Sequence, residues 1–185
     1  GLKDHSNDEL AAIMAGKKVG VGFSMTDRFF LLSGNTNRED LETQLQLQTA
    51  YLMHPGYRQD GVTLLRRAIP MIYNKMDHEV QGAMKKQVPA ILYRNNPRFT
   101  FPTQEQLTSY QVKDVRDWVD APLKNNYMEV TVTGDFRTED IIPLLERTVG
   151  AVPKRAEAPA TLDETLRHPA MADFNFSKDL TYDSS

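Results

Sequence analysis

Residues 5–9, HSNDE, combine a histidine with an aspartate and a glutamate, and they are the first place where this sequence could hold a metal. Hydrolysis at zinc needs at least three nitrogen or oxygen ligands around the metal, a position for water and commonly a glutamate as base. Two imidazoles on one helical face must stand four residues apart, and no two histidines of this chain do. The four histidines are His5, His54, His78 and His168. No helical zinc motif is therefore present in the sequence.

Other chemistries have even less support. The chain has no cysteine, which excludes disulfides, thiol catalysis and thiolate metal sites. It has no G-x-S-x-G turn for a nucleophilic serine, and GVGF at 20–23 lacks the spacing of a nucleotide-binding loop. The loop Arg94–Phe99 combines arginines, asparagines and an aromatic ring, which suits an anionic or peptide ligand, but a structural role between two helices is favoured.

The polar residues of the opening stretch have a structural explanation. Ser6 and Glu9 stand three residues apart before an amphipathic turn that ends at Gly16, which is the pattern of a capping box followed by a glycine stop. Further helix caps are predicted at Thr36 with Glu39, at Thr103 with Gln106 and at Thr138. The acidic residues after Thr138 then complement the helix dipole, so they need no bound cation.

The hydrophobic pattern predicts an α+β domain. Two runs, 19–25 and 28–34, form an expected β-hairpin, and 127–133 alternates as a further strand of the same sheet. Helices, expected mostly on one face of this sheet, follow Thr36, Tyr57, Glu79, Thr103, Gln111 and Thr138. Pro70 should kink or break the second of them.

The chain is expected to hold one domain over 1–150. From 151 to 185 the sequence has three prolines and no sustained period, which predicts a linker or an extended arm toward a further domain. A net charge of −3 with scattered lysines and arginines argues against nucleic acid as a partner. The longest apolar runs are too short for a membrane span, which argues against a membrane partner.

Three stretches carry a resemblance to a known family. They are RFFLLSGNTNREDLETQLQLQTAYLMHPGYRQDGV, NNPRFTFPTQEQLTSYQVKDVRDWV and NNYMEVTVTGDFRTEDIIPLLERTVGAVPKR, and the GDF…GAVP part is the most specific. In this order they resemble the insulinase and pitrilysin type zinc peptidases, which include mitochondrial processing peptidase. The resemblance covers about residues 2–155 and implies a processing-peptidase-like fold that lacks its first strand and its zinc-motif helix.

The resemblance also implies which half of such a protein this is. Catalytic halves carry an H-x-x-E-H helix, which would precede Gly1, and a glutamate ligand on the helix after the PGY stretch. Residues 66–76 contain no glutamate, and Asp77 and Glu79 are the nearby carboxylates that could replace it. The resemblance therefore favours a non-catalytic half, which is not an enzyme by itself and holds no metal, with zinc in a homologous catalytic half.

Such a half would shape the substrate chamber of a metalloendopeptidase and support its catalytic half. An extended peptide substrate can add to an exposed sheet edge, and Val19, Val21 and Phe23 are the candidate residues, although a buried hairpin is the plainer expectation. Two alternatives stay open: part of a catalytic half whose zinc motif lies outside these residues, or a structural or interaction subunit without proteolytic activity. Family habit and the missing cysteine favour a bacterial periplasm or cell envelope.

Overall fold

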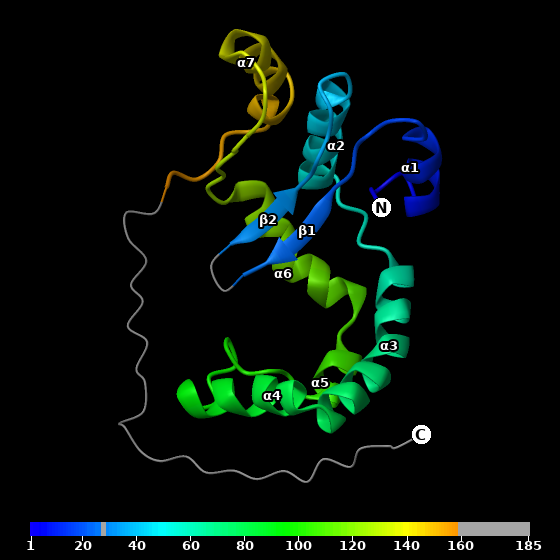
Figure 1. The fold of residues 1–185 in the computed structure, drawn as a ribbon, viewed down its shortest axis with the longest axis vertical. Coiled ribbons are helices and arrows are strands. Elements are labelled where there is room, and N and C mark those ends of the chain that lie inside the picture. The colour runs from blue at the N-terminus through cyan, green and yellow to red at the C-terminus, as the bar shows by residue number, and fades with distance from the viewer. Residues whose placement is uncertain (27–28, 159–185) are drawn as a thin grey trace. The chain divides into compact units, whose positions relative to one another are not determined.

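The structure is a computed structural model that describes residues 1–26 and 29–158 (Figure 1). The described residues form two compact units: unit 1 holds residues 1–58 and 112–158, and unit 2 holds residues 59–111. The expected domain over 1–150 and arm over 151–185 stay predictions, because residues 159–185 lie outside the described part of the chain.

Unit 1 contains an antiparallel hairpin of β1, Gly22–Met25, and β2, Phe30–Ser33 (Figure 1). Met25 is opposite Phe30 and Phe23 is opposite Leu32, so these four side chains share one face of the pair. Phe30 and Leu32 pack on the buried residues Leu52, Val119 and Leu123. The predicted hairpin is confirmed, with strands shorter than the 19–25 and 28–34 runs.

Unit 1 also contains four helices and one 3-10 turn, which are α1 Asn7–Ile13, α2 Leu41–Met53, α6 Val112–Asn125, α7 Thr138–Glu146 and η1 Val149–Ala151. Helix α2 contributes to both cores of the unit: Leu52 lies in the hairpin core, and Leu47 packs with Leu2 and Leu10. The α+β class is therefore confirmed, with α2 as the element that joins the two cores.

One predicted cap of unit 1 is confirmed and two are wrong. Ser6 Oγ accepts from the Glu9 N–H at 3.2 Å, and the Ser6 N–H donates to the Glu9 carboxylate at 2.7 Å, which completes the capping box. Thr36 and Glu39 form no such box, because the Asn37 side chain accepts from the Asp40 N–H and delays the helix start to Leu41. Thr138 is the first helical residue of α7, and its N-cap is Arg137, which has no side-chain cap bond.

The strand predicted over 127–133 is also wrong for the described residues. These residues are extended chain between α6 and α7, and the described sheet has only the two strands β1 and β2. Met128, Val130 and Val132 alternate along the segment and Met128 packs on the hairpin core, but a strand also needs a neighbour for its backbone. Within residues 1–26 and 29–158 the segment has no such neighbour.

Unit 2 is helical: α3 Gln59–His78, α4 Val80–Leu92 and α5 Gln104–Ser109. Helix α3 is continuous through Pro70, so of the two predicted outcomes the break does not occur. Tyr73 is buried, and its hydroxyl donates to the Pro102 carbonyl. The box predicted at Thr103 is confirmed, since Thr103 Oγ1 accepts from the Gln106 N–H at 3.2 Å.

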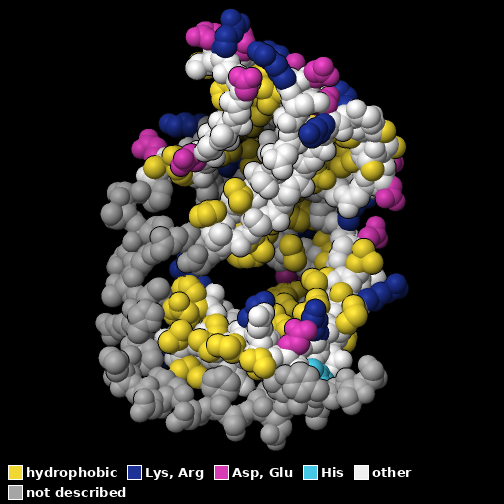
Figure 2. Space-filling view, in the orientation of Figure 1, with side chains coloured by type: hydrophobic (Ala, Val, Ile, Leu, Met, Phe, Trp, Pro, Cys, Tyr) yellow, Lys and Arg dark blue, Asp and Glu magenta, His cyan; other side chains and the backbone are white. Residues whose placement is uncertain are grey.

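The loop after α4 has the structural role that the sequence favours. The rings of Tyr93 and Phe99 stack with centroids 4.5 Å apart, and the Asn96 carbonyl accepts from the N–H groups of Phe99 and Thr100. Apolar side chains nevertheless remain exposed on the visible surface of this unit (Figure 2). Met71 and Met84 of this unit are each more than half exposed. None of the helices in the described residues is both long and apolar enough to cross a membrane.

Candidate functional site

Val19, Val21 and Phe23, the three residues predicted to bind peptide, do not lie together on one exposed face of a strand. Val19 and Val21 precede β1, and their half-buried side chains pack against the core of Leu2, Leu10 and Leu47. Phe23 lies in β1 and is 47% exposed, on the face that it shares with Phe30. The backbone of β1 and the ring of Phe23 are therefore the parts of this segment that a ligand can reach.

Gln44 closes the wide end of the hairpin. Its side chain is buried in α2, its Oε1 accepts from the Gly20 N–H at 2.9 Å, and its Nε2 donates to the Gly20 carbonyl at 2.8 Å. A Cβ at Gly34 would lie 2.1 Å from Gln44 Nε2 and 2.6 Å from the Gly20 oxygen, so the three residues meet at close range. The amide of Gln44 thus occupies both backbone groups of Gly20, and the free edge of β1 begins beyond it.

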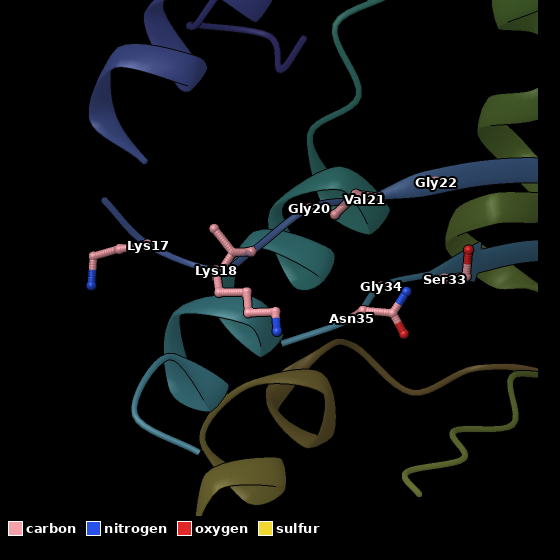
Figure 3. Close-up of a pocket in the computed structure, with 9 residues that line it drawn as sticks. Lys17, Lys18, Gly20, Val21, Gly22, Ser33, Gly34 and Asn35 are labelled. Atoms are coloured by element: carbon pink, nitrogen blue, oxygen red, sulfur yellow. The ribbon is translucent and has the colours of Figure 1, made fainter. Parts of the chain in front are cut away.

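An open depression of about 600 Å³ lies at this end of the hairpin, lined by residues 17–22 and 33–35. Lys17 is held at its rim by the Asp40 carboxylate at 3.7 Å and by Thr43 Oγ1 at 3.2 Å. The Lys18 ammonium has no partner among the described residues, and Figure 3 shows its side chain directed toward the segment of Gly34 and Asn35. With no carboxylate in the lining, the depression suits a polar or anionic part of an extended polypeptide.

A row of aromatic rings runs from the hairpin to α6. The Phe23 and Phe30 centroids are 5.7 Å apart, and Trp118 stands edge-on to Phe30 at 5.8 Å. Trp118 is 60% exposed and Met25, beside Phe30 on the same strand face, is 49% exposed. Half-exposed aromatic and methionine side chains of this kind suit contact with apolar side chains of a partner.

The carboxylates nearest to the expected ligand position are engaged by lysines. Asp77 Oδ1 lies 2.7 Å from Lys86 Nζ, and the Lys86 ammonium also stands 4.7 Å above the Tyr73 ring. Glu79 pairs with Lys75 at 3.7 Å. Within the described part of the chain, no three histidine, aspartate or glutamate side chains come together as a metal site requires.

None of the three described histidines belongs to such a group. His5 and His54 are exposed in unit 1, and the His78 ring lies 2.7 Å from the Asn74 carbonyl in unit 2. His168 lies outside the described residues.

In unit 1, burial raises the pKa of Tyr57 to about 12, and the negative charge of Asp120 adds to the shift. The Tyr57 phenol is therefore protonated at neutral pH and is a packing group rather than a base.

Sequence reasoning missed Gln44, Lys18 and Trp118. Gln44 has a recognisable signal, because it stands three residues from both Leu41 and Leu47, on the apolar stripe of its helix. Trp118 follows Val115 by three residues and was predicted only as part of an amphipathic helix. Nothing in the sequence around Lys18 indicates that its ammonium lacks a partner among the described residues. It lacks one because the nearby Asp40 carboxylate pairs with the Lys17 ammonium and accepts from the Lys18 N–H.

Comparison with known proteins relates the chain to proteases. It is 21% identical over 138 residues to the chloroplastic stromal processing peptidase of Pisum sativum, and 20% identical over 140 residues to that of Arabidopsis thaliana. These matches cover 74% and 75% of this chain but only 11% of each relative, so the chain spans about a tenth of their length. No protein-family model matches the chain.

Solved protease structures share the fold. A mutant of the ferredoxin protease FusC, in complex with Arabidopsis ferredoxin, superposes with a TM-score of 0.65 at 17% identity. A protease from Helicobacter pylori superposes with a TM-score of 0.66 at 13% identity. Each match covers 91% of this chain, and 18% and 41% of the respective neighbour. The chain thus shares its fold with part of each of these two proteases and is similar in sequence to part of the stromal processing peptidases.

Proposed function

We propose that these residues belong to the non-catalytic half of a two-half zinc metalloendopeptidase of the insulinase and pitrilysin type. In this role they form part of the wall of a substrate chamber, contact peptide substrates and support the homologous catalytic half, which carries the zinc. The observation that carries the proposal is the likeness to two proteases over 91% of the chain. The sequence similarity to processing peptidases points to the same class of protein.

The non-catalytic assignment is supported by the helix pair α3 and α4. A ligand glutamate is expected on α3, and residues 66–76 have no carboxylate. Downstream, Lys86 holds Asp77 and Lys75 lies beside Glu79. A carboxylate that already pairs with an ammonium must give up that partner before it can bind a metal, which weakens both as replacement ligands.

The contact with peptide substrates is supported by the hairpin. An extended peptide can pair with the outer edge of β1 beyond Gly22, while apolar side chains of the peptide lie against Phe23 and Trp118. FusC is a ferredoxin protease whose solved complex contains ferredoxin. By analogy we expect polypeptide substrates for the parent of this chain.

The assignment is tested by zinc content in the full-length parent protein. Asp77→Asn and Glu79→Gln should leave one zinc per catalytic half and unchanged cleavage of an unfolded protein, because neither carboxylate is a ligand. Asp60→Asn, at an acidic residue in the first turn of α3, the helix that also carries Asp77, is the matched control. Metal is measured by plasma mass spectrometry, with circular dichroism to verify folding.

Two outcomes would contradict the proposal in different ways. Loss of zinc in the Asp77 or Glu79 variant, with Asp60→Asn unaffected, would place these residues in a catalytic half. A folded, zinc-loaded parent that cleaves no unfolded polypeptide would instead favour a structural or interaction subunit.

A further inference from the structure

The hydrogen-bonded ladder of the hairpin ends at Gly22 and Ser33. Bonded and unbonded pairs alternate along an antiparallel ladder. The Thr26 N–H donates to the Phe29 carbonyl at 3.0 Å, so every second pair counted from there is a bonded one. In the observed register Gly22 and Ser33 are therefore a bonded pair, and they are the last pair of the two strands. Both residues line the depression at this end of the hairpin.

The next bonded pair in this register would be Gly20 with Asn35. Gln44 prevents this pair, because its side-chain amide already accepts from the Gly20 N–H and donates to the Gly20 carbonyl. The backbone N–H and C=O groups of Asn35 consequently have no hydrogen bond within the part of the chain that the structure describes. Asn35 lines the depression, so its N–H group is a donor that a ligand can satisfy.

An unpaired cation lies at the same place. Among residues 1–26 and 29–158, the Lys18 ammonium has no partner, and Figure 3 shows its side chain directed toward the segment of Gly34 and Asn35. The Asp40 carboxylate is already in use, since Oδ2 accepts from the Lys18 N–H at 2.8 Å and Oδ1 lies 3.7 Å from the Lys17 ammonium. No acidic side chain lines the depression, which therefore has a positive charge without a counter-charge in its lining.

We propose that the depression binds a carboxylate of the polypeptide substrate, with one oxygen at the Lys18 ammonium and the other at the Asn35 N–H. Carboxylates are the anionic groups of an unmodified polypeptide, and each of their two oxygens accepts hydrogen bonds. Bonds of this kind from a charged donor are shorter and stronger than neutral ones.

The proposal deepens the proposed function, on which it rests in taking the ligand to be a polypeptide. It adds a preference among substrates and names Lys18 as the residue that determines it. Two sources can supply the carboxylate: the side chain of an aspartate or glutamate, and the C-terminus of a peptide. The chemistry of the site is the same for both, so the test includes each source separately.

Peptide binding to the full-length parent protein tests the proposal. Short unfolded peptides carry an uncharged dye at the N-terminus and differ only in their carboxylates. The first has one glutamate and an amidated C-terminus, the second has glutamine instead and a free C-terminus, and the third has glutamine and an amidated C-terminus. Stopped-flow anisotropy measures the Kd before any cleavage. The first or the second peptide, or both, should bind about 3- to 10-fold more tightly than the third, as one charged hydrogen bond provides.

Substitution of Lys18 should remove this preference for a carboxylate. In Lys18→Gln the three peptides should bind equally, whereas Lys18→Arg should keep most of the preference, because arginine retains the charge and the donors. Lys3→Gln is the matched control, at another exposed lysine of unit 1 that has no ion pair among the described residues. Salt at about 0.5 M should reduce the preference of the native protein and leave Lys18→Gln unchanged.

A substitution at Gly20 tests the location of the bound carboxylate. A Cβ at Gly20 meets no atom within 4 Å, so Gly20→Val should fold normally and take up part of the space in the depression, which Gly20 lines. This variant should therefore also lose the preference for a carboxylate. Circular dichroism verifies the folding of each variant.

Equal binding of the three peptides to the native parent, or no binding of any of them, would overturn the proposal. So would a preference that survives in Lys18→Gln or in Gly20→Val, because the carboxylate would then be bound elsewhere. An equal loss in Lys3→Gln would show a general effect of charge and would also contradict it. None of these readouts uses cleavage or zinc. Failure here therefore leaves the zinc test of the proposed function unaffected, and failure of that test leaves the carboxylate site standing.

Discussion

At Gly34 the chain leaves β2 under the side chain of Gln44, and there is no room for a Cβ. Where the two strands diverge, the Gln44 side chain makes the two hydrogen bonds with Gly20 that a paired strand would otherwise make. The buried Gln44 amide is stabilising here, because its oxygen and its nitrogen each pair with a backbone group of Gly20. If the amide were displaced, these buried polar atoms would lose their hydrogen bonds. The arrangement therefore depends on glycine at 34.

We expect Gly34→Ala to lower the free energy of unfolding by about 1–3 kcal/mol, because the new methyl group forces Gln44 and the Gly20 carbonyl apart. Gly61→Ala on α3 is the control, since a Cβ there meets nothing within 4 Å, and it should be neutral or stabilising by up to about 1 kcal/mol. Urea unfolding, followed by Trp118 fluorescence and circular dichroism, measures both. Placing Gly34→Ala in a Gln44→Ala background should reduce its cost, and an unchanged cost would show that the amide is not the obstacle.

Helix α3 shows how an element can tolerate a residue that should end it. Pro70 lies in the middle of its 20 residues and has no N–H to donate to the carbonyl four residues earlier. The helix continues because its neighbours are anchored: Ile69 is 1% exposed, and Tyr73 is held by the Pro102 carbonyl. Tertiary contacts on both sides of the proline therefore outweigh the lost helical bond.

Replacing the proline should strengthen the helix. We expect Pro70→Ala to raise the free energy of unfolding by about 1–2 kcal/mol, since a helical hydrogen bond is regained while the unfolded chain gains some freedom. Met71→Ala, at a neighbouring side chain that is 71% exposed, should change stability by no more than about 0.5 kcal/mol. Thermal unfolding followed by circular dichroism gives both values. A destabilised Pro70→Ala variant would show that the core is fitted to a bend at the proline.

At the scale of the molecule, five carboxylates of the described residues have lowered pKa values, for two different reasons. The Ser6 backbone and side chain hold the pKa of Glu9 below its ordinary value, and the N–H of Glu105 with the Thr103 side chain does the same for the pKa of Glu105. Basic partners lower the pKa of the other three: Arg147 for Glu42, Lys113 for Asp117 and Arg137 for Asp140. Both units therefore carry carboxylates that folding favours in the charged form.

This distribution predicts acid sensitivity. A lowered folded pKa gives stability that is present above the ordinary values of 4.5 for glutamate and 3.8 for aspartate, and that is lost as the pH falls through the folded pKa. The urea midpoint should therefore fall steadily as the pH falls below about 4.5. High salt should weaken the three pairs with basic partners but not the two helix caps. A midpoint independent of pH between 5 and 3 would contradict the prediction.

Local structure was predictable where a residue's partners lie within one turn. The capping boxes at Ser6 and Thr103 are correct because donor and acceptor stand three residues apart. The box at Thr36 fails because Asn37 competes for the same helix start, and because the Asp40 carboxylate accepts from the Lys18 N–H, 22 residues away. Of the candidate site, only Phe23 kept an accessible side chain, since the packing of Val19 and Val21 depends on α1 and α2.

The sequence by itself determined the helices, the hairpin, the lack of a helical zinc motif and the resemblance to peptidases. These follow from the spacing of apolar residues and from short-range caps, which the chain carries in any context. The tertiary structure alone decided that Gln44 closes the hairpin, that Lys86 holds Asp77 and that 127–133 has no neighbour among the described residues. Those outcomes depend on contacts between residues far apart in the sequence, and such contacts produce no periodic pattern of residue types from which they could be predicted.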